Sequence, residues 1–202
     1  MPLVTNAGSP ALSPPGTAWQ ILDVAERLVQ TRGYNGFSYA DISGELGITK
    51  ASLHYHFRTK ADLGRQLIVR YTLAFGAALQ AIEATDAAVG EKLSRYVALY
   101  ADVLAGERMC LCGMLAAEYS SLPAPMQQEI RAFFDVNEEW LAQLLAEGRD
   151  SHALHFDGSA QDMARLFMSA LEGAMLIARP YGDPARFQVS ADRLLGEITS
   201  QP

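Results

Sequence analysis

The chain has 202 residues, half of them apolar, and a formal net charge of −7 at pH 7, which suits a small domain joined to a medium-sized one. No apolar run is long enough to span a membrane, and the charge of the whole chain argues against general affinity for nucleic acid. The only cysteines, Cys110 and Cys112, are too close in sequence for an unstrained disulfide bond, so the sequence implies no disulfide framework. This agrees with a reducing compartment, and we expect the protein in the cytoplasm.

The expected elements begin with a tail. Residues 1–16 contain four of the nine prolines and no Lys or Arg, so we expect a disordered segment rather than a signal peptide. After it, the sequence shows helical periodicity and no convincing strand alternation. The expected helices lie at about residues 17–32, 38–47, 50–57, 59 to the low eighties, 88–105, 110–121, 124–149, 159–179 and 184–199. The expected fold class is therefore all-α.

Residues 37–63 contain the signals of a helix-turn-helix. Ser38 and Asp41 form a capping-box pattern at the start of the first short helix. Gly47 lies in the turn, and Thr49 is the expected N-cap of the second short helix.

The distribution of charge agrees with a DNA contact at this end. Residues 1–65 carry six basic and five acidic side chains, whereas residues 66–202 carry ten and eighteen. Between residues 47 and 65, four basic side chains are accompanied by Asp62 alone. A basic stretch on an acidic body indicates a protein that contacts DNA at one end. The alternative, on charge alone, is an ordinary solvated helix face.

The second short helix has one face for the protein and another for DNA. Leu53 and Phe57, four residues apart, are expected to pack on Ile42 and Leu46. The helix N-terminus directs free N–H groups toward phosphate. Small side chains on the first turn allow close approach to base edges. The residues left for DNA are Thr49, Lys50, Ala51 and Ser52 on the first turn, then His54, Tyr55, His56 and Lys60. For His56 the alternative is simple exposure to solvent.

This segment resembles the DNA-binding domain of the tetracycline-repressor (TetR) family of bacterial regulators. The matching residues are Gly33, Tyr34, Phe37, Asp41, Ile42, Leu46, Gly47, Ile48, Thr49, Lys50, Leu53, Tyr55, Phe57, Lys60 and Leu63. The resemblance implies phosphate contacts from Tyr39, Thr49, Tyr55, His56 and Lys60, and groove contacts from Lys50, Ala51, Ser52 and His54. At His54 the sequence departs from the family, where Tyr is frequent. The implied organisation is an N-terminal three-helix DNA-binding domain, residues 17–64, and a C-terminal helical ligand-binding and dimerisation domain, residues 65–202.

The C-terminal domain offers a dimer interface and an effector pocket. Helices 159–179 and 184–199 carry long apolar stripes, and the resemblance implies that they form a four-helix interface in a homodimer. The alternative is that the stripes are intramolecular core. Bulky residues in the middle helices are candidates for a pocket, although plain core is the common role of such residues. Glu118 and Glu172, in otherwise apolar helices, either orient a ligand or are paired or solvated. The candidate pocket consists of Tyr96, Tyr100, Cys110, Met114, Glu118, Trp140 and Phe167.

Residues 109–118 carry a second resemblance, to the C-x-x-G-x-L-x-x-E stretch of a TetR subgroup that includes the N-ethylmaleimide-reductase repressor. In that subgroup the cysteine that matches Cys110 responds to electrophiles. This chain departs from the pattern at Met114, where Asn is common, and adds Cys112. A helix start and the nearby Arg108 favour a lowered pKa for Cys110. A buried structural thiol is the alternative.

Other functional classes have little support in the sequence. His152 and His155 lie in a loop without recognised metal-ligand spacing, so we expect no metal site. There is no Gly-rich phosphate loop, nucleophile elbow or HExxH motif. The enzyme alternative is a thiol hydrolase that uses Cys110 with a histidine. We expect instead a homodimeric repressor without cofactor, released from operator DNA by a small-molecule or electrophilic effector.

Overall fold

The computed structural model describes residues 16–199, so the expected tail over residues 1–16 lies outside the described residues except for Gly16. Within this range the regular structure is entirely helical, and the all-α expectation is confirmed. The elements are α1 (Thr17–Arg32), α2 (Tyr39–Leu46), α3 (Lys50–His56), α4 (Lys60–Glu83), α5 (Val89–Ala105), α6 (Leu111–Ala117), η1 (Tyr119–Ser121), α7 (Ala124–Asp150), α8 (Ala160–Ala178), η2 (Arg179–Tyr181) and α9 (Pro184–Thr199).

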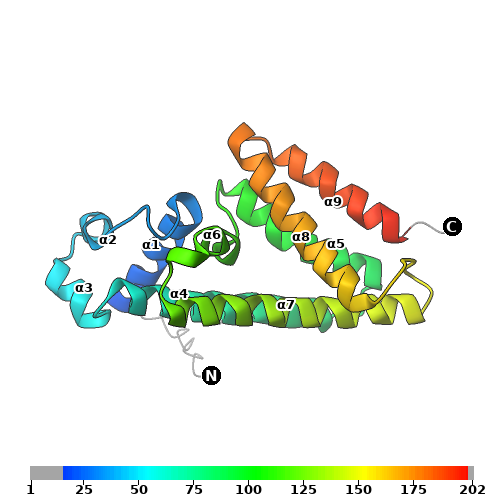
Figure 1. Ribbon diagram of the computed structural model, residues 1–202, viewed down its shortest axis with the longest axis horizontal. Coiled ribbons are helices and arrows are strands. Elements are labelled where there is room, and N and C mark those ends of the chain that lie inside the picture. The colour runs from blue at the N-terminus through cyan, green and yellow to red at the C-terminus, as the bar shows by residue number, and fades with distance from the viewer. Residues whose placement is uncertain (1–15, 200–202) are drawn as a thin grey trace, which may run out of the picture.

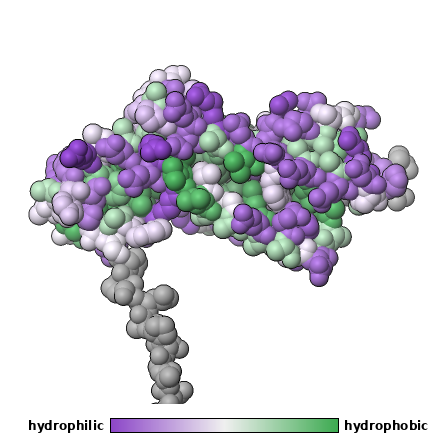
Figure 2. All heavy atoms as spheres, turned by 90° about the horizontal axis from the view of Figure 1, so that it is seen from below, coloured by the Kyte–Doolittle hydropathy of each residue, from purple (hydrophilic) through white to green (hydrophobic). Residues whose placement is uncertain are grey.

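The helices form an elongated molecule with distinct ends (Figure 1). Helices α1, α2 and α3 gather at one end, and α8 and α9 pack on each other toward the other end. The long helices α4 and α7 run side by side and connect the two ends. Helix α6 lies between the groups and contacts α1, α4 and α7. Seen from the side on which α4 and α7 lie, the surface alternates between hydrophilic and apolar patches (Figure 2).

Local capping explains where the first helices begin and end. The Thr59 hydroxyl accepts a hydrogen bond from the Asp62 N–H at 3.0 Å, and the Asp62 carboxylate accepts one from the Thr59 N–H at 3.0 Å. The same reciprocal arrangement of Ser38 and Asp41 opens α2. Gly47 ends α2 with φ 64°, a left-handed conformation that glycine adopts at little cost. These caps fix the chain direction on both sides of the turn between α2 and α3.

Apolar side chains from α1 to α4 form the core of the DNA-binding end. Leu53, at 0% exposure, Phe57 and Ile42 are buried in one cluster, and the half-buried Leu46 packs against that cluster, in agreement with the four-residue spacing. Removing such a fully buried leucine side chain costs roughly 2–5 kcal/mol. The core of the other end is built mainly from aromatic and leucine side chains of α5, α7, α8 and α9. Both cores belong to one continuous buried cluster.

The expected helix boundaries agree with the structure to within a few residues, with one informative difference. The helix expected over residues 110–121 is divided into α6 and the short 3-10 helix η1. The division falls at Glu118, where φ is −102° and ψ is 9°, and the Glu118 N–H bonds to the Leu115 carbonyl. Because of this break, Glu118 is the C-cap of α6 and not a residue within a continuous helix.

Candidate nucleic-acid interface and effector pocket

Helix α3 presents an exposed surface at the end of the molecule. The Thr49 hydroxyl caps it by accepting a hydrogen bond from the Ser52 N–H at 3.1 Å. Lys50, Ala51 and His54 are exposed, and the Tyr55 side chain is 85% exposed. Among the described residues, Lys50 has no carboxylate partner within ion-pair distance. A cation on the first turn of α3 and an exposed phenol on its second turn are suited to contacts with a polyanion.

Tyr39 and His54 form the wall beside this surface. The Tyr39 hydroxyl donates to the Phe57 carbonyl at 3.0 Å, and its ring lies 4.9 Å from the His54 ring. Burial raises the pKa of Tyr39 to about 12, so its hydroxyl keeps its proton. The ring nitrogen Nδ1 of His54 is hydrogen-bonded to the Arg58 carbonyl at 3.0 Å. A surface hollow of about 440 Å³ lies here, lined by Phe37, Ser38, Tyr39, Ala40, Lys50, His54 and Lys60.

Lys60, an expected phosphate contact, points toward the protein. Its ammonium group donates to the carbonyls of Tyr34 and Phe37, both at 2.5 Å. It also lies 4.4 Å from the Tyr34 ring centre and 4.2 Å from that of Phe37. Burial lowers the pKa of Lys60 below its ordinary value. In this conformation the cation stabilises the loop before α2, an arrangement that does not favour a phosphate contact.

Arg58 is a candidate that the sequence analysis counted as charge and did not assign to the site. It is exposed in the turn between α3 and α4 and has no ion-pair partner among residues 16–199. With Tyr55 and His56 it lines a second hollow of about 380 Å³. Its position directly after the reading helix was the available signal.

The candidate pocket contains a closed hydrogen-bond ring. The Tyr96 hydroxyl donates to Asn137 Oδ1 at 2.8 Å, and Asn137 Nδ2 donates to the Tyr100 hydroxyl at 3.0 Å. The Tyr96 and Tyr100 oxygens are 3.1 Å apart. Because the Tyr96 proton is used on Asn137, Tyr100 donates to Tyr96. Burial raises the pKa of both phenols. The sequence analysis missed Asn137, which is a polar residue on the inward face of α7.

Aromatic rings surround this triad. The Tyr96 ring stacks on Trp140 with centres 5.6 Å apart and lies 6.3 Å from Phe167. The indole N–H of Trp140 is buried and has no hydrogen-bond partner. An orphan donor of this kind is rare in a folded protein and calls for an explanation.

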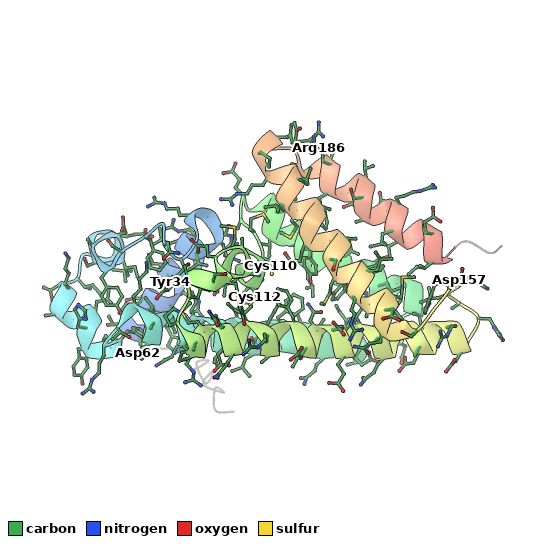
Figure 3. All side chains as sticks on the ribbon, viewed as in Figure 1. Tyr34, Asp62, Cys110, Cys112, Asp157 and Arg186 are labelled. Carbon is green, nitrogen blue, oxygen red and sulfur yellow. The ribbon has the colours of Figure 1, made fainter. Side chains whose placement is uncertain are left out.

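Cys110, the N-cap of α6, and Cys112, in the first turn of α6, are both buried (Figure 3). The expectation of a lowered Cys110 pKa is wrong. Burial, followed by the neighbouring Glu172 carboxylate, raises the pKa of Cys110 well above its ordinary value. Burial likewise raises the pKa of Cys112. Helix α6 has only seven residues, and its dipole does not outweigh the loss of solvent around the sulfur.

Glu172 of α8 is the acidic group of this region. Its Oε1 atom is buried without a hydrogen-bond partner, and burial raises its pKa from 4.5 to about 7. The carboxylate reaches close to α6 because position 113 is glycine: a Cβ there would lie 2.2 Å from Glu172 Oε2. A carboxyl group and two thiols therefore meet at the N-terminal end of α6.

Glu118 and Met114 were expected in the pocket, and the structure directs both elsewhere. Glu118 accepts a hydrogen bond from the Tyr34 N–H at 2.5 Å, on the DNA-binding end. The Met114 sulfur lies 3.2 Å from the Arg179 guanidinium. The pocket assignment is therefore corrected for Glu118, because its carboxylate is occupied by backbone donors. The structure keeps Tyr96, Tyr100, Cys110 and Phe167 in the buried core, and the half-buried Trp140 packs against it.

Within residues 16–199, no three His, Cys, Asp or Glu side chains come together in a way that would hold a metal ion. None of the helices in that part of the chain combines the length and the apolar character that crossing a membrane requires.

Both halves of the chain match known protein families. Residues 21–67 match the family described as bacterial regulatory proteins, tetR family, and residues 90–194 match the tetracyclin repressor-like C-terminal domain. The chain is 25% identical over 171 residues to the HTH-type transcriptional repressor NemR of Escherichia coli K12, covering 81% of this chain and 84% of that protein. It is 28% identical over 152 residues to the transcriptional regulator AcuR of Cereibacter sphaeroides, covering 73% and 69% respectively.

Solved structures agree with these matches. A TetR-family transcriptional regulator from Agrobacterium tumefaciens superposes with a TM-score of 0.87 at 36% identity, covering 91% of this chain and 97% of that one. A TetR regulator from Legionella pneumophila gives a TM-score of 0.85 at 33% identity, covering 93% and 100%.

Proposed function

The chain belongs to the TetR family of bacterial regulatory proteins and is a DNA-binding transcriptional regulator; from this premise we propose that it is a homodimeric repressor that reads operator DNA with α3 and is released by a small-molecule effector. A DNA-binding regulator acts where the chromosome is, so we propose the cytoplasm as its compartment. The observation that carries the proposal is the first turn of α3, where Lys50 is exposed and has no ion-pair partner among the described residues.

We assign the DNA contacts by exposure and charge. Lys50, Ala51 and Ser52 are the candidates for base edges, because they lie on the first turn of α3. Tyr55 and Arg58 are candidates for phosphate because both side chains are exposed beside that turn. Thr49 and His56 complete the phosphate-facing set. Tyr39 and His54 then support the reading helix from its side, in agreement with their contacts to Phe57 and Arg58.

The homodimer is proposed to form through α8 and α9. These helices expose Leu166, Leu176, Ile177 and Val189, with between 55% and 70% of each side chain accessible in the single chain. Burial of exposed leucine, isoleucine and valine side chains is the usual source of affinity in a symmetric dimer. We expect sedimentation of the native protein to give a dimer at micromolar concentration, and Ile177→Glu to give monomers.

The effector is proposed to bind at the aromatic core near Glu172. The Trp140 N–H and the Glu172 Oε1 atom are both buried without partners. A small molecule that offers one acceptor and one donor would satisfy them, which favours a polar organic effector. Reaction of Cys110 with an electrophile is the second candidate, supported by the resemblance of residues 109–118 to the electrophile-responsive subgroup. The thiol-hydrolase alternative is disfavoured because burial raises the pKa of both thiols.

The test of DNA binding is selection of a duplex from a random-sequence library by the purified protein. We expect enrichment of an inverted repeat, because a twofold dimer presents two copies of α3. The affinity for the selected duplex should fall steeply as salt rises, since phosphate contacts release counterions. Recovery of no preferred sequence at low salt would contradict the proposed function.

A further inference from the structure

The loop that follows α1 is held by a carboxylate from the C-terminal domain. Glu118 Oε2 accepts a hydrogen bond from the Tyr34 N–H at 2.5 Å. Glu118 Oε1 accepts from the Asn35 N–H at 3.2 Å and from the Asn35 side-chain amide at 3.2 Å. The Asn35 amide also donates to the Ser121 hydroxyl at 2.9 Å. Two successive backbone N–H groups at the entrance to the helix-turn-helix thus depend on one side chain 84 positions away.

Gly33 makes this approach possible. Its φ of 81° is a conformation that L side chains rarely adopt, and it directs the next N–H groups toward Glu118. A Cβ at this position would lie 3.0 Å from both carboxylate oxygens of Glu118. Gly33 therefore has two roles: it ends α1, and it leaves room for the Glu118 carboxylate to reach the loop.

The same loop is hydrogen-bonded to the start of α4, the helix that follows the reading helix α3. The Tyr34 and Phe37 carbonyls accept hydrogen bonds from Lys60, the first residue of α4. Tyr34 therefore joins Glu118 on its N–H side to Lys60 on its carbonyl side. Glu118 and the first residue of α4 are thus joined through a single peptide segment, which leads on to α2. Figure 3 shows Tyr34 in this position, between α1 and α6.

Helix α6 joins this contact to the candidate effector region. Cys110 is its N-cap and Glu118 is its C-cap, and the seven residues between them span only about 10 Å. At the N-terminal end, Gly113 lies against the buried Glu172 carboxylate. The helix that carries Glu118 at one end therefore borders the candidate effector region at the other.

We propose that Glu118 is a positioning residue that couples α6 to the orientation of the DNA-reading helices. The proposal rests on the proposed function, because it assigns to Glu118 the link between effector site and operator affinity. With the contact made, the helix-turn-helix is held at a fixed angle on α6, and the spacing of the two α3 helices in the dimer is fixed. With the contact broken, that spacing varies.

Other contacts keep the DNA-binding end attached when Glu118 is changed. The Met109 N–H donates to the Gln30 carbonyl at 3.2 Å, and the Arg179 guanidinium donates to the Thr31 carbonyl. Both of these contacts act on the last turn of α1 and not on the loop that leads to α2. Variants of Glu118 are therefore expected to fold and dimerise.

The experiment compares Glu118→Ala and Glu118→Gln with a matched control, Glu138→Ala. Glu138 also makes side-chain contacts, to Gln161 and Arg165, but both lie within the C-terminal domain. The probes are the duplex that the wild-type protein selects from a random library and the same duplex lengthened by one base pair between its half-sites. Affinity is measured by fluorescence anisotropy, and thermal unfolding and dimer mass are measured in parallel.

We expect Glu118→Ala to lower the affinity for the selected duplex by about tenfold, the size of a typical coupling between sites. We also expect a smaller ratio between the affinities for the selected and the lengthened duplex, because a looser attachment tolerates altered spacing. Glu118→Gln keeps one acceptor oxygen and should lie between wild type and alanine. Glu138→Ala should leave both values unchanged.

A role in folding alone would lower thermal stability while leaving the spacing ratio intact, and that outcome would overturn the proposal. Wild-type affinity and wild-type spacing preference in Glu118→Ala would overturn it as well. Failure of the wild-type protein to select any duplex would instead overturn the proposed function, and the role of Glu118 with it.

Discussion

The two ends of α6 place carboxylates in opposite environments. At the C-terminal end, Glu118 is half-buried and accepts three hydrogen bonds from the loop of the DNA-binding end. At the N-terminal end, Glu172 faces α6 from α8 with one buried oxygen that has no partner, and burial raises its pKa to about 7. The oxygens of Glu118 are occupied by backbone and side-chain donors, which makes this carboxylate a structural contact. Glu172, with a raised pKa and an unpartnered oxygen, is poised to change its charge or to bind a ligand.

The largest effect that would sharpen this contrast is expected from Glu172→Gln. A carboxyl whose pKa is 4.5 when unfolded and about 7 when folded binds more protons in the folded state between these values. The wild-type protein therefore loses up to about 3 kcal/mol of stability as pH rises from 4.5 to 7. Glu172→Gln removes this loss, so it should be more stable than wild type at pH 7.5.

The measurement is urea unfolding of both proteins at pH 5 and pH 7.5. Gln161→Ala serves as the control, because it changes an exposed side chain of the same helix and removes no titratable group. Its pH dependence should run parallel to that of wild type between pH 5 and pH 7.5. A parallel profile for Glu172→Gln as well would contradict the difference between the two carboxylates.

The next effect concerns the satisfied part of the same core. Asn137→Ala leaves the Tyr96 hydroxyl without its acceptor and the Tyr100 hydroxyl without its donor. A buried unsatisfied polar group costs about 2 kcal/mol, in addition to the cavity. Thermal unfolding should show the loss, and Gln161→Ala on the surface of the same domain should not. Unchanged stability would indicate that the triad is not closed in solution.

A smaller effect is expected at the other end of the molecule, on binding and not on stability. Lys50→Ala and Tyr55→Ala should each lower affinity for the selected duplex by about tenfold, while thermal unfolding stays unchanged. If Lys50 contacts phosphate, the slope of log affinity against log salt also falls by about one. Lys92→Ala, which removes a cation paired with Glu83 in the C-terminal domain, is the control. Wild-type affinity in both Lys50→Ala and Tyr55→Ala would rule out α3 as the reading helix.

The smallest effect concerns the rate at which the two thiols are alkylated. Because burial raises the pKa of both thiols, alkylation of the native protein by a maleimide should be slower than in urea. Cys110→Ser and Cys112→Ser assign the reaction to one sulfur, and operator affinity before and after alkylation tests the sensor role. Rapid alkylation of native Cys110, together with release from DNA, would support the electrophilic effector.

The helix-turn-helix was predictable because its signals are local. The capping residues Ser38 and Thr49, Gly47 in the turn, and the spacing of Leu53 and Phe57 all act within a few positions along the chain. The structure places each of them as the pattern predicted. The exposed face of α3 follows from the same spacing, because whatever does not pack inward faces solvent.

The partners of the acidic residues were not predictable from such patterns. Glu118 and Glu172 look alike in sequence, as single acids in apolar helices, and the pocket was assigned to Glu118. The partner of Glu118 is the Tyr34 N–H, 84 residues away and directly after a glycine with positive φ, and no local pattern links the two. The prediction of a lowered pKa for Cys110 failed for the same reason: a helix start is visible in sequence, whereas burial by other helices is not.

The contact between Glu118 and the loop after α1 also limits how the chain can be divided and recombined. During synthesis the helix-turn-helix is made before residue 118. The Tyr34 and Asn35 N–H groups therefore gain their Glu118 acceptor only once α6 has been made. The same dependence applies to hybrid regulators. A DNA-binding domain grafted onto a foreign sensor domain keeps its reading helix, but it needs an acidic side chain at the matching place to recover its set angle. Exchange of the two halves between relatives should succeed when the donor carries both Gly33 and the carboxylate.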